Sequence, residues 1–100
     1  MVTPGHFLVL AAVLFAVGAA GVVLRRNVIV IFMCIELMLN AANLTFVAAS
    51  NALGNMDGQT AVLFVMTVAA GEAAIGLAVI LSMYRARQSL DVDDMVTLRW

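Results

Sequence analysis

The sequence is poor in the residues from which a soluble enzyme or a nucleic-acid-binding domain is usually built. Its 100 residues include no lysine, one histidine and one cysteine, and only 11% of them are charged. A single cysteine, Cys34, can form neither a disulfide framework nor a four-thiolate zinc or iron–sulfur site within one chain. Five scattered arginines and a net charge of −1 give no electrostatic footprint for nucleic acid.

Apolar residues, in contrast, make up 65% of the chain. A soluble body of this size would have too few polar residues to cover its surface. Three apolar stretches, residues 5–24, 28–49 and 60–83, are each long enough to cross a hydrocarbon core of about 30 Å as a helix of about 20 residues. The sequence therefore predicts an all-α integral membrane protein, in which residues 1–100 form a single membrane domain with three transmembrane helices.

The connections between these stretches are short, and their charges indicate an orientation. The first is the tripeptide RRN at residues 25–27, and the second, residues 50–59, contains the Asn, Gly and Asp typical of turns. Arginines occur in the first connection and after the third stretch, at Arg85 and Arg87, whereas the other side has none. The positive-inside rule therefore predicts a cytoplasmic C-terminus and an N-terminus outside, on the periplasmic side.

The polar tail, residues 84–100, carries Asp91, Asp93 and Asp94 and is too short to fold alone. We expect a solvated, partly disordered cytoplasmic end. The alternative is a strap that becomes ordered on a neighbouring subunit.

Two glutamates lie inside the apolar stretches, where a charged side chain costs about 2.5–3.5 kcal/mol on insertion scales. Glu36 is eight residues from the start of the second stretch, and Glu72 is eleven residues from the end of the third. At 1.5 Å per residue, the two carboxylates lie about 12 Å and about 16 Å from the cytoplasmic boundary. The sequence thus predicts two carboxylates at similar height near the middle of the bilayer.

The surroundings of the two glutamates differ. Glu36, Asn40 and Asn43 follow i, i+4, i+7 spacing, so they share one side of a helix. Because a polar stripe exposed to lipid would lack hydrogen-bond partners, we expect it to meet protein or water. Glu72 lies in a run of alanines and glycines, residues 69–76, with no polar partner on its own helix. Its partner is expected on another helix, of this chain or of another.

Two interpretations fit an intramembrane glutamate. In the first, each is a protonated side chain that only joins helices through a hydrogen bond. In the second, desolvation and a nearby like charge disfavour the ionised form, so that uptake and release of a proton both become accessible. Two carboxylates at matched depth favour the second interpretation, proton transfer or coupling at Glu36 and Glu72, with Asn40 and Asn43 as supporting polar groups.

The second and third stretches resemble a known family. The tracts RRNVIVIFMCIELMLNAANLTFV (residues 25–47) and VMTVAAGEAAIGLAV (residues 65–79) are similar to the K subunit of proton-translocating NADH:quinone oxidoreductase, respiratory complex I. The most specific parts are IELMLNAANL and the second glutamate in its run of small residues. The resemblance covers all three stretches, and the tail beyond Arg87 adds little to it.

The resemblance implies a subunit of the membrane arm, next to subunits related to antiporters, in a bacterial inner membrane. In that family two intramembrane glutamates belong to a chain of buried ionisable groups, and by motif they correspond to Glu36 and Glu72. The basic residues of the family's cytoplasmic loop correspond to Arg25 and Arg26. The resemblance also implies no catalytic residue for redox chemistry and no cofactor on this chain, because NADH, FMN, the iron–sulfur clusters and quinone bind on or beside other subunits.

Other classes of membrane protein are alternatives. The nearest is the C subunit of multi-subunit sodium/proton antiporters, also a three-span chain, and the presence of both Glu36 and Glu72 favours the oxidoreductase over it. A rotor-ring subunit of an ATP synthase has two helices, and a small drug exporter usually has four. The last alternative is a purely structural assembly subunit, which would tolerate loss of either carboxylate's charge.

Overall fold

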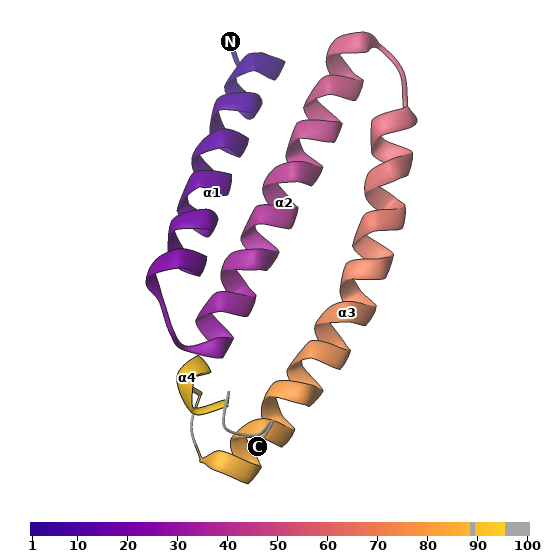
Figure 1. The fold of residues 1–100 in the computed structure, drawn as a ribbon. Coiled ribbons are helices and arrows are strands. Elements are labelled where there is room, and N and C mark those ends of the chain that lie inside the picture. The colour runs from indigo at the N-terminus through magenta and orange to yellow at the C-terminus, as the bar shows by residue number, and fades with distance from the viewer. Residues whose placement is uncertain (89, 96–100) are drawn as a thin grey trace.

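The computed structural model, which describes residues 1–88 and 90–95, is built from three long helices, each antiparallel to the one before it in the chain (Figure 1). They are α1 (Pro4–Leu24), α2 (Val28–Leu53) and α3 (Asp57–Arg87), and a single helical turn, α4 (Val92–Met95), follows them. The middle helix, α2, packs against both α1 and α3. All three long helices are long and apolar enough to cross a membrane, which confirms the predicted all-α membrane fold.

The connection between α1 and α2 is the tripeptide expected from the sequence, residues 25–27. Asn27 ends the turn by capping α2: its side-chain oxygen accepts hydrogen bonds from the backbone N–H groups of Ile29, at 2.9 Å, and Val30, at 3.2 Å. Asparagine is among the preferred residues at this position because its short side chain can reach these unpaired donors. The hairpin is therefore fixed by local chemistry.

The second connection is much shorter than expected. Residues 50–59 were predicted to form a loop, but α2 continues to Leu53 and α3 begins at Asp57. Gly54 ends α2 in the left-handed conformation, with φ of 72°, as is common at helix C-termini. The hydroxyl of Ser50 donates a hydrogen bond to the carbonyl oxygen of Asn55, which closes the turn.

The end of the third helix is also displaced from the prediction. The helix continues four residues beyond Met83 and ends at Arg87, and Gln88 follows in the left-handed conformation. A hydropathy pattern marks the part of a helix that lies in lipid, whereas α3 has 31 residues and a length of about 46 Å. Such a helix extends beyond a hydrocarbon core of about 30 Å, so polar residues at its ends do not break it.

The beginning of the tail lies against this chain, an arrangement that neither expectation included. Residues 90–92 lie antiparallel to residues 26–28, with a bridge between Asn27 and Asp91. This part of the tail thus contacts the α1–α2 turn of its own chain. The remainder of the predicted tail, residues 96–100, lies outside the described residues.

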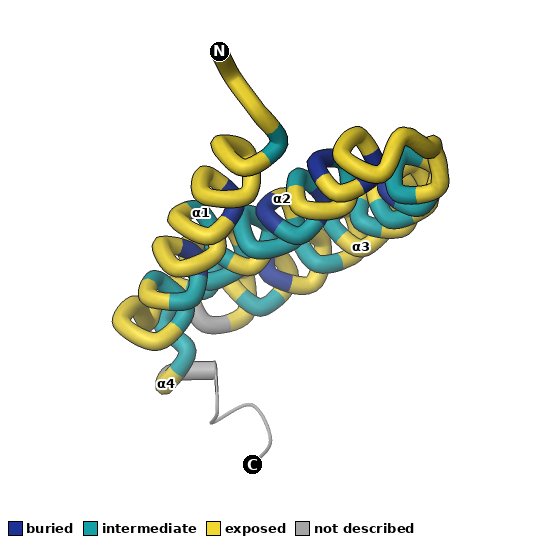
Figure 2. The backbone as a smooth tube through the Cα atoms, turned by 90° about the horizontal axis from the view of Figure 1, so that it is seen from above, coloured by how far each residue is buried: buried dark blue, intermediate teal, exposed yellow. Residues whose placement is uncertain are grey.

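Packing between α1 and α2 depends on small side chains. Ala11 and Ala41 are almost fully buried, and a methyl group on Gly18 would lie 2.7 Å from the carbonyl oxygen of Cys34. Gly21 approaches the Cys34 side chain equally closely. Few other positions are buried, and most of the chain is exposed (Figure 2), as expected where the surrounding medium is lipid or other protein.

This packing predicts opposite effects for two glycine-to-alanine changes in helices. Gly18→Ala should destabilise the fold by about 1–3 kcal/mol, because the new methyl group overlaps the α2 backbone. In Gly71→Ala the new methyl group meets no atom within 4 Å. This change should stabilise α3 by about 0.5–1 kcal/mol, since alanine is a better helix former than glycine. Thermal loss of helical circular dichroism from the full chain in detergent micelles measures both. A Gly18→Ala protein as stable as Gly71→Ala would contradict the close approach.

Candidate functional site

Two glycines of α3 set its register against α2. A methyl group on Gly76 would lie 2.7 Å from the ring of Phe32, so the ring occupies the space that the missing side chain leaves. Near the other end of the interface, Gly58 lies against the backbone of Phe46 and the side chain of Ser50. These contacts, almost the length of the interface apart, fix how far the two antiparallel helices are shifted along each other.

This register places the two intramembrane glutamates at the same level. Glu36 lies four residues after Phe32, and Glu72 lies four residues before Gly76. Both carboxylates are therefore one turn, about 6 Å, along the interface from the Phe32–Gly76 contact. The similar height expected from the sequence is found, and it now follows from contacts between the helices.

The environments of the two carboxylates are unequal. Glu36 is half-buried, and it lies on the side of α2 that bears Phe32 and Leu39, toward α3. Glu72 is exposed at the margin of the interface, where it lines a groove of about 280 Å³ with Leu39 of α2 and four residues of α3, namely Phe64, Val65, Val68 and Ala69. Neither carboxylate has a hydrogen-bond or ion-pair partner within the described ranges.

The two asparagines that were expected to share a stripe with Glu36 lie in different surroundings. Asn43 is 8% exposed, and its side-chain oxygen is buried without a hydrogen-bond partner among the described residues, whereas Asn40 is exposed. Three residues turn a helix by about 300°, which offsets these two side chains by about 60° around the axis. Only Asn43 therefore lies in the buried part of α2, and Asn40 faces away from this chain's interior.

The two arginines of the first connection also differ. One guanidinium nitrogen of Arg26 donates to both carboxylate oxygens of Asp93 at 2.8 Å, and both side chains are exposed. Arg25 is exposed and makes no ion pair in the part of the chain that the structure describes. In the sequence, Asp93 is one of three aspartates in the tail, and no local pattern could pair it with Arg26, because 67 residues separate the two.

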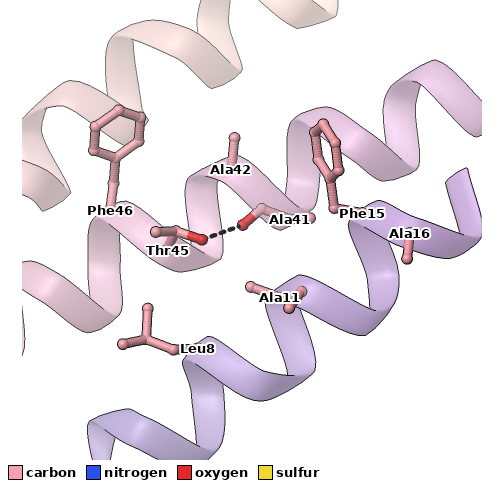
Figure 3. Close-up of a pocket in the computed structure, with 9 residues that line it drawn as sticks. Leu8, Ala11, Phe15, Ala16, Ala41, Ala42, Thr45 and Phe46 are labelled. Carbon is pink, nitrogen blue, oxygen red and sulfur yellow. Dashed lines mark hydrogen bonds between the residues drawn. The ribbon is translucent and has the colours of Figure 1, made fainter. Parts of the chain in front are cut away.

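A large groove on the other side of α2 carries no titratable group. It lies between α1 and α2, has a volume of about 570 Å³ and is lined almost wholly by apolar side chains (Figure 3). Its one hydroxyl, on Thr45, donates to the carbonyl oxygen of Ala41 at 3.0 Å and is satisfied within its own helix. The groove offers space for an apolar chain and no chemistry.

The side chains of this site can therefore support few kinds of chemistry. Within the described residues no three His, Cys, Asp or Glu side chains come close enough to hold a metal ion. What remains is a pair of carboxyl groups at one level in the membrane, one turned toward α3 and the other toward the outer surface of the chain. Carboxyl groups in such positions can bind and release protons, or change charge in response to a neighbour.

Comparison with known proteins places the chain in one family. Residues 6–100 match the family described as NADH-ubiquinone/plastoquinone oxidoreductase chain 4L. The chain is 56% identical over 100 residues to NADH-quinone oxidoreductase subunit K 2 of Geotalea uraniireducens, and 54% identical over 100 residues to subunit K 1 of Geotalea daltonii, with all of each chain covered. It is 57% identical to subunit K 2 of Geobacter metallireducens over 99% of each chain. The chain thus belongs to the family of NADH-quinone oxidoreductase subunit K.

Proposed function

We propose that this chain is the membrane-arm subunit through which Glu36 and Glu72 take part in the proton-translocation pathway of an NADH:quinone oxidoreductase. Full-length similarity to subunits of that complex supports the assignment to the complex. The observation that carries the role of the glutamates is the α2–α3 register, which brings both carboxylates to one level. NADH oxidation and quinone reduction are then the work of other subunits, and this chain contributes titratable groups.

The exposure of the site supports a pathway that continues into neighbouring subunits. Glu72 and Asn40 lie on the surface of this chain, and a polar side chain left against lipid would have no hydrogen-bond partner. In the assembled complex a neighbouring membrane subunit, of the antiporter-like type, would cover them. Glu36, half-buried between α2 and α3, then lies behind Glu72 as the inner member of the pair.

A purely structural role for the carboxylates is the remaining alternative, and Glu36 distinguishes the two. Glu36→Gln keeps the volume and the hydrogen-bonding capacity but cannot release a proton. Coupled turnover should fall by about tenfold or more, in line with the contribution of a positioned proton-transfer group. Glu36→Asp, which still titrates, should keep much of the activity. NADH oxidation coupled to proton uptake, normalised to the amount of assembled complex, is the measurement. Full pumping by an assembled Glu36→Gln complex would leave only the structural role.

The paired arrangement makes a prediction for Glu72. If the two carboxylates act in one path, Glu72→Gln should also lower pumping, and the double Glu36→Gln, Glu72→Gln variant should be little worse than the more severe single variant. Groups that act as a unit give such non-additive losses, whereas independent groups give losses that multiply. Measuring proton pumping by the two single variants and by the double variant completes this double-mutant cycle. Losses that multiply would show two separate roles.

The charge distribution supports an orientation in which the Arg25–Arg26 turn and the end of α3 are cytoplasmic and the α2–α3 turn is outside. In a Cys34→Ser background, a cysteine at the exposed Met56 should react with a membrane-impermeant maleimide added to intact cells. A cysteine at the exposed Ala86 should react only after the cells are opened. The reverse labelling pattern would refute this orientation.

A further inference from the structure

The segment that follows α3 folds back onto the α1–α2 turn. The backbone N–H of Val28 donates to the carbonyl oxygen of Leu90 at 2.7 Å, and the N–H of Val92 donates to the carbonyl oxygen of Arg26 at 2.9 Å. These two bonds flank the antiparallel bridge between Asn27 and Asp91. Residues 90–92 therefore form a short strand-like contact with the turn.

This contact adds to the N-terminal cap of α2. The first four backbone N–H groups of a helix, counted from the cap residue, have no partner inside the helix, and here they are those of residues 27–30. The side chain of Asn27 accepts from the N–H groups of Ile29 and Val30. The N–H of Val28 donates to the carbonyl oxygen of Leu90. The helix that carries Glu36 thus receives one of its cap bonds from the segment after the helix that carries Glu72.

A charged contact secures the segment. Asp93 accepts two hydrogen bonds of 2.8 Å from Arg26, and its own backbone N–H donates to the side chain of Asp91 at 2.8 Å, which orients the turn. The side chains of Arg26 and Asp93 are 68% and 64% exposed, so the pair is open to solvent. An exposed pair of this kind shifts an equilibrium by at most about fivefold.

We propose that residues 90–93 are an intramolecular latch that holds α2 and α3 in register at the arginine end, with Asp93 as a positioning residue that acts through Arg26. Beyond the close approach of Gly76 to Phe32, α3 continues for eleven residues to Arg87. Along this part, Leu90 of the segment lines an apolar groove together with Ile29 of α2 and Tyr84 of α3, so the segment lies where the two helices meet. The latch stays closed during turnover. Its effect on proton coupling rests on the proposed function, whereas its existence does not.

The first experiment tests the latch by cross-linking in the assembled complex. Asn27 and Asp91 form a pair that is not directly hydrogen-bonded, for which the Cα atoms lie about 4.5 Å apart, within the range of a disulfide. Asn27→Cys with Asp91→Cys, in a Cys34→Ser background, should form a disulfide on mild oxidation and keep the same turnover before and after oxidation. The control pair, Asn27→Cys with Met56→Cys, joins opposite ends of α2 and should form none.

Two results of this experiment would overturn the proposal. Absence of the Asn27–Asp91 cross-link in the assembled complex would mean that the segment docks elsewhere, such as on another subunit. A loss of turnover that appears on oxidation and disappears on reduction would mean that the segment must open during the reaction.

The second experiment tests Asp93. In the double-cysteine protein, Asp93→Asn should slow cross-linking by up to about fivefold, and the exchange of Arg26→Asp with Asp93→Arg should restore the rate. Asp57→Asn removes a carboxylate at the opposite end of the bundle and should leave the rate unchanged. An unchanged rate in Asp93→Asn would overturn its locking role.

The positioning role has a separate readout. In a protein with Cys34 and no introduced cysteine, the number of protons pumped per NADH should fall in the Asp93→Asn variant. It should return to the original value in the variant that combines Arg26→Asp with Asp93→Arg. An unchanged number of protons per NADH would overturn positioning by Asp93. The roles of Glu36 and Glu72 would still be tested by the variants at those two residues. If proton pumping is impaired in Glu36→Gln but unaffected in Asp93→Asn, the positioning role of Asp93 fails while the proposed function stands.

Discussion

The close approach of α3 to α2 at Gly58 and Gly76 is the constraint on which the arrangement of the site depends. At both positions a side chain would collide with α2, and at Gly76 the space is filled by the ring of Phe32. Because these contacts are far apart along the interface, a shift of one turn would disturb both. Glu36 and Glu72 are therefore at one level for a packing reason, without any direct bond between the carboxyl groups.

The same chain leaves polar groups where only another molecule can satisfy them. Glu72 and Asn40 lie on its outer surface, and most of its apolar side chains are exposed as well. In lipid, where a lone polar group has no partner, such a surface is stable only against protein or water. α1 packs closely on α2 through Gly18 and Ala11. Its one titratable side chain, His6, contacts Thr3 at the start of the helix, so α1 contributes no titratable group to the site. It acts as a support for the helix that carries Glu36.

Sequence reasoning predicted the features that depend on short-range rules. Three spans, the tripeptide turn and the similar height of the glutamates follow from hydropathy and the rise per residue. The prediction of a loop over residues 50–59 was wrong, because hydropathy marks the part of a helix in the lipid core, whereas both helices extend into the polar region beyond it. The contact of Arg26 with Asp93, and the separation of Asn43 from Asn40, depend on which faces of the helices meet, and that is a property of the fold alone.

The chemistry of the buried groups in α2 favours the proposed proton-transfer role of Glu36 over a purely structural one. A neutral interhelical hydrogen bond in a membrane contributes about 0.6 kcal/mol on average, and an amide can form it without any ionisable group. The chain already places an amide in α2 at Asn43, which is more deeply buried than Glu36. A carboxyl group at the centre of the membrane adds only one property to those of an amide, a proton that can leave. When that proton leaves, the charge costs about 2.5–3.5 kcal/mol on insertion scales, a penalty that neighbouring charges and water can reduce. A group in this position is therefore sensitive to the charge of its neighbours, as proton coupling between subunits requires.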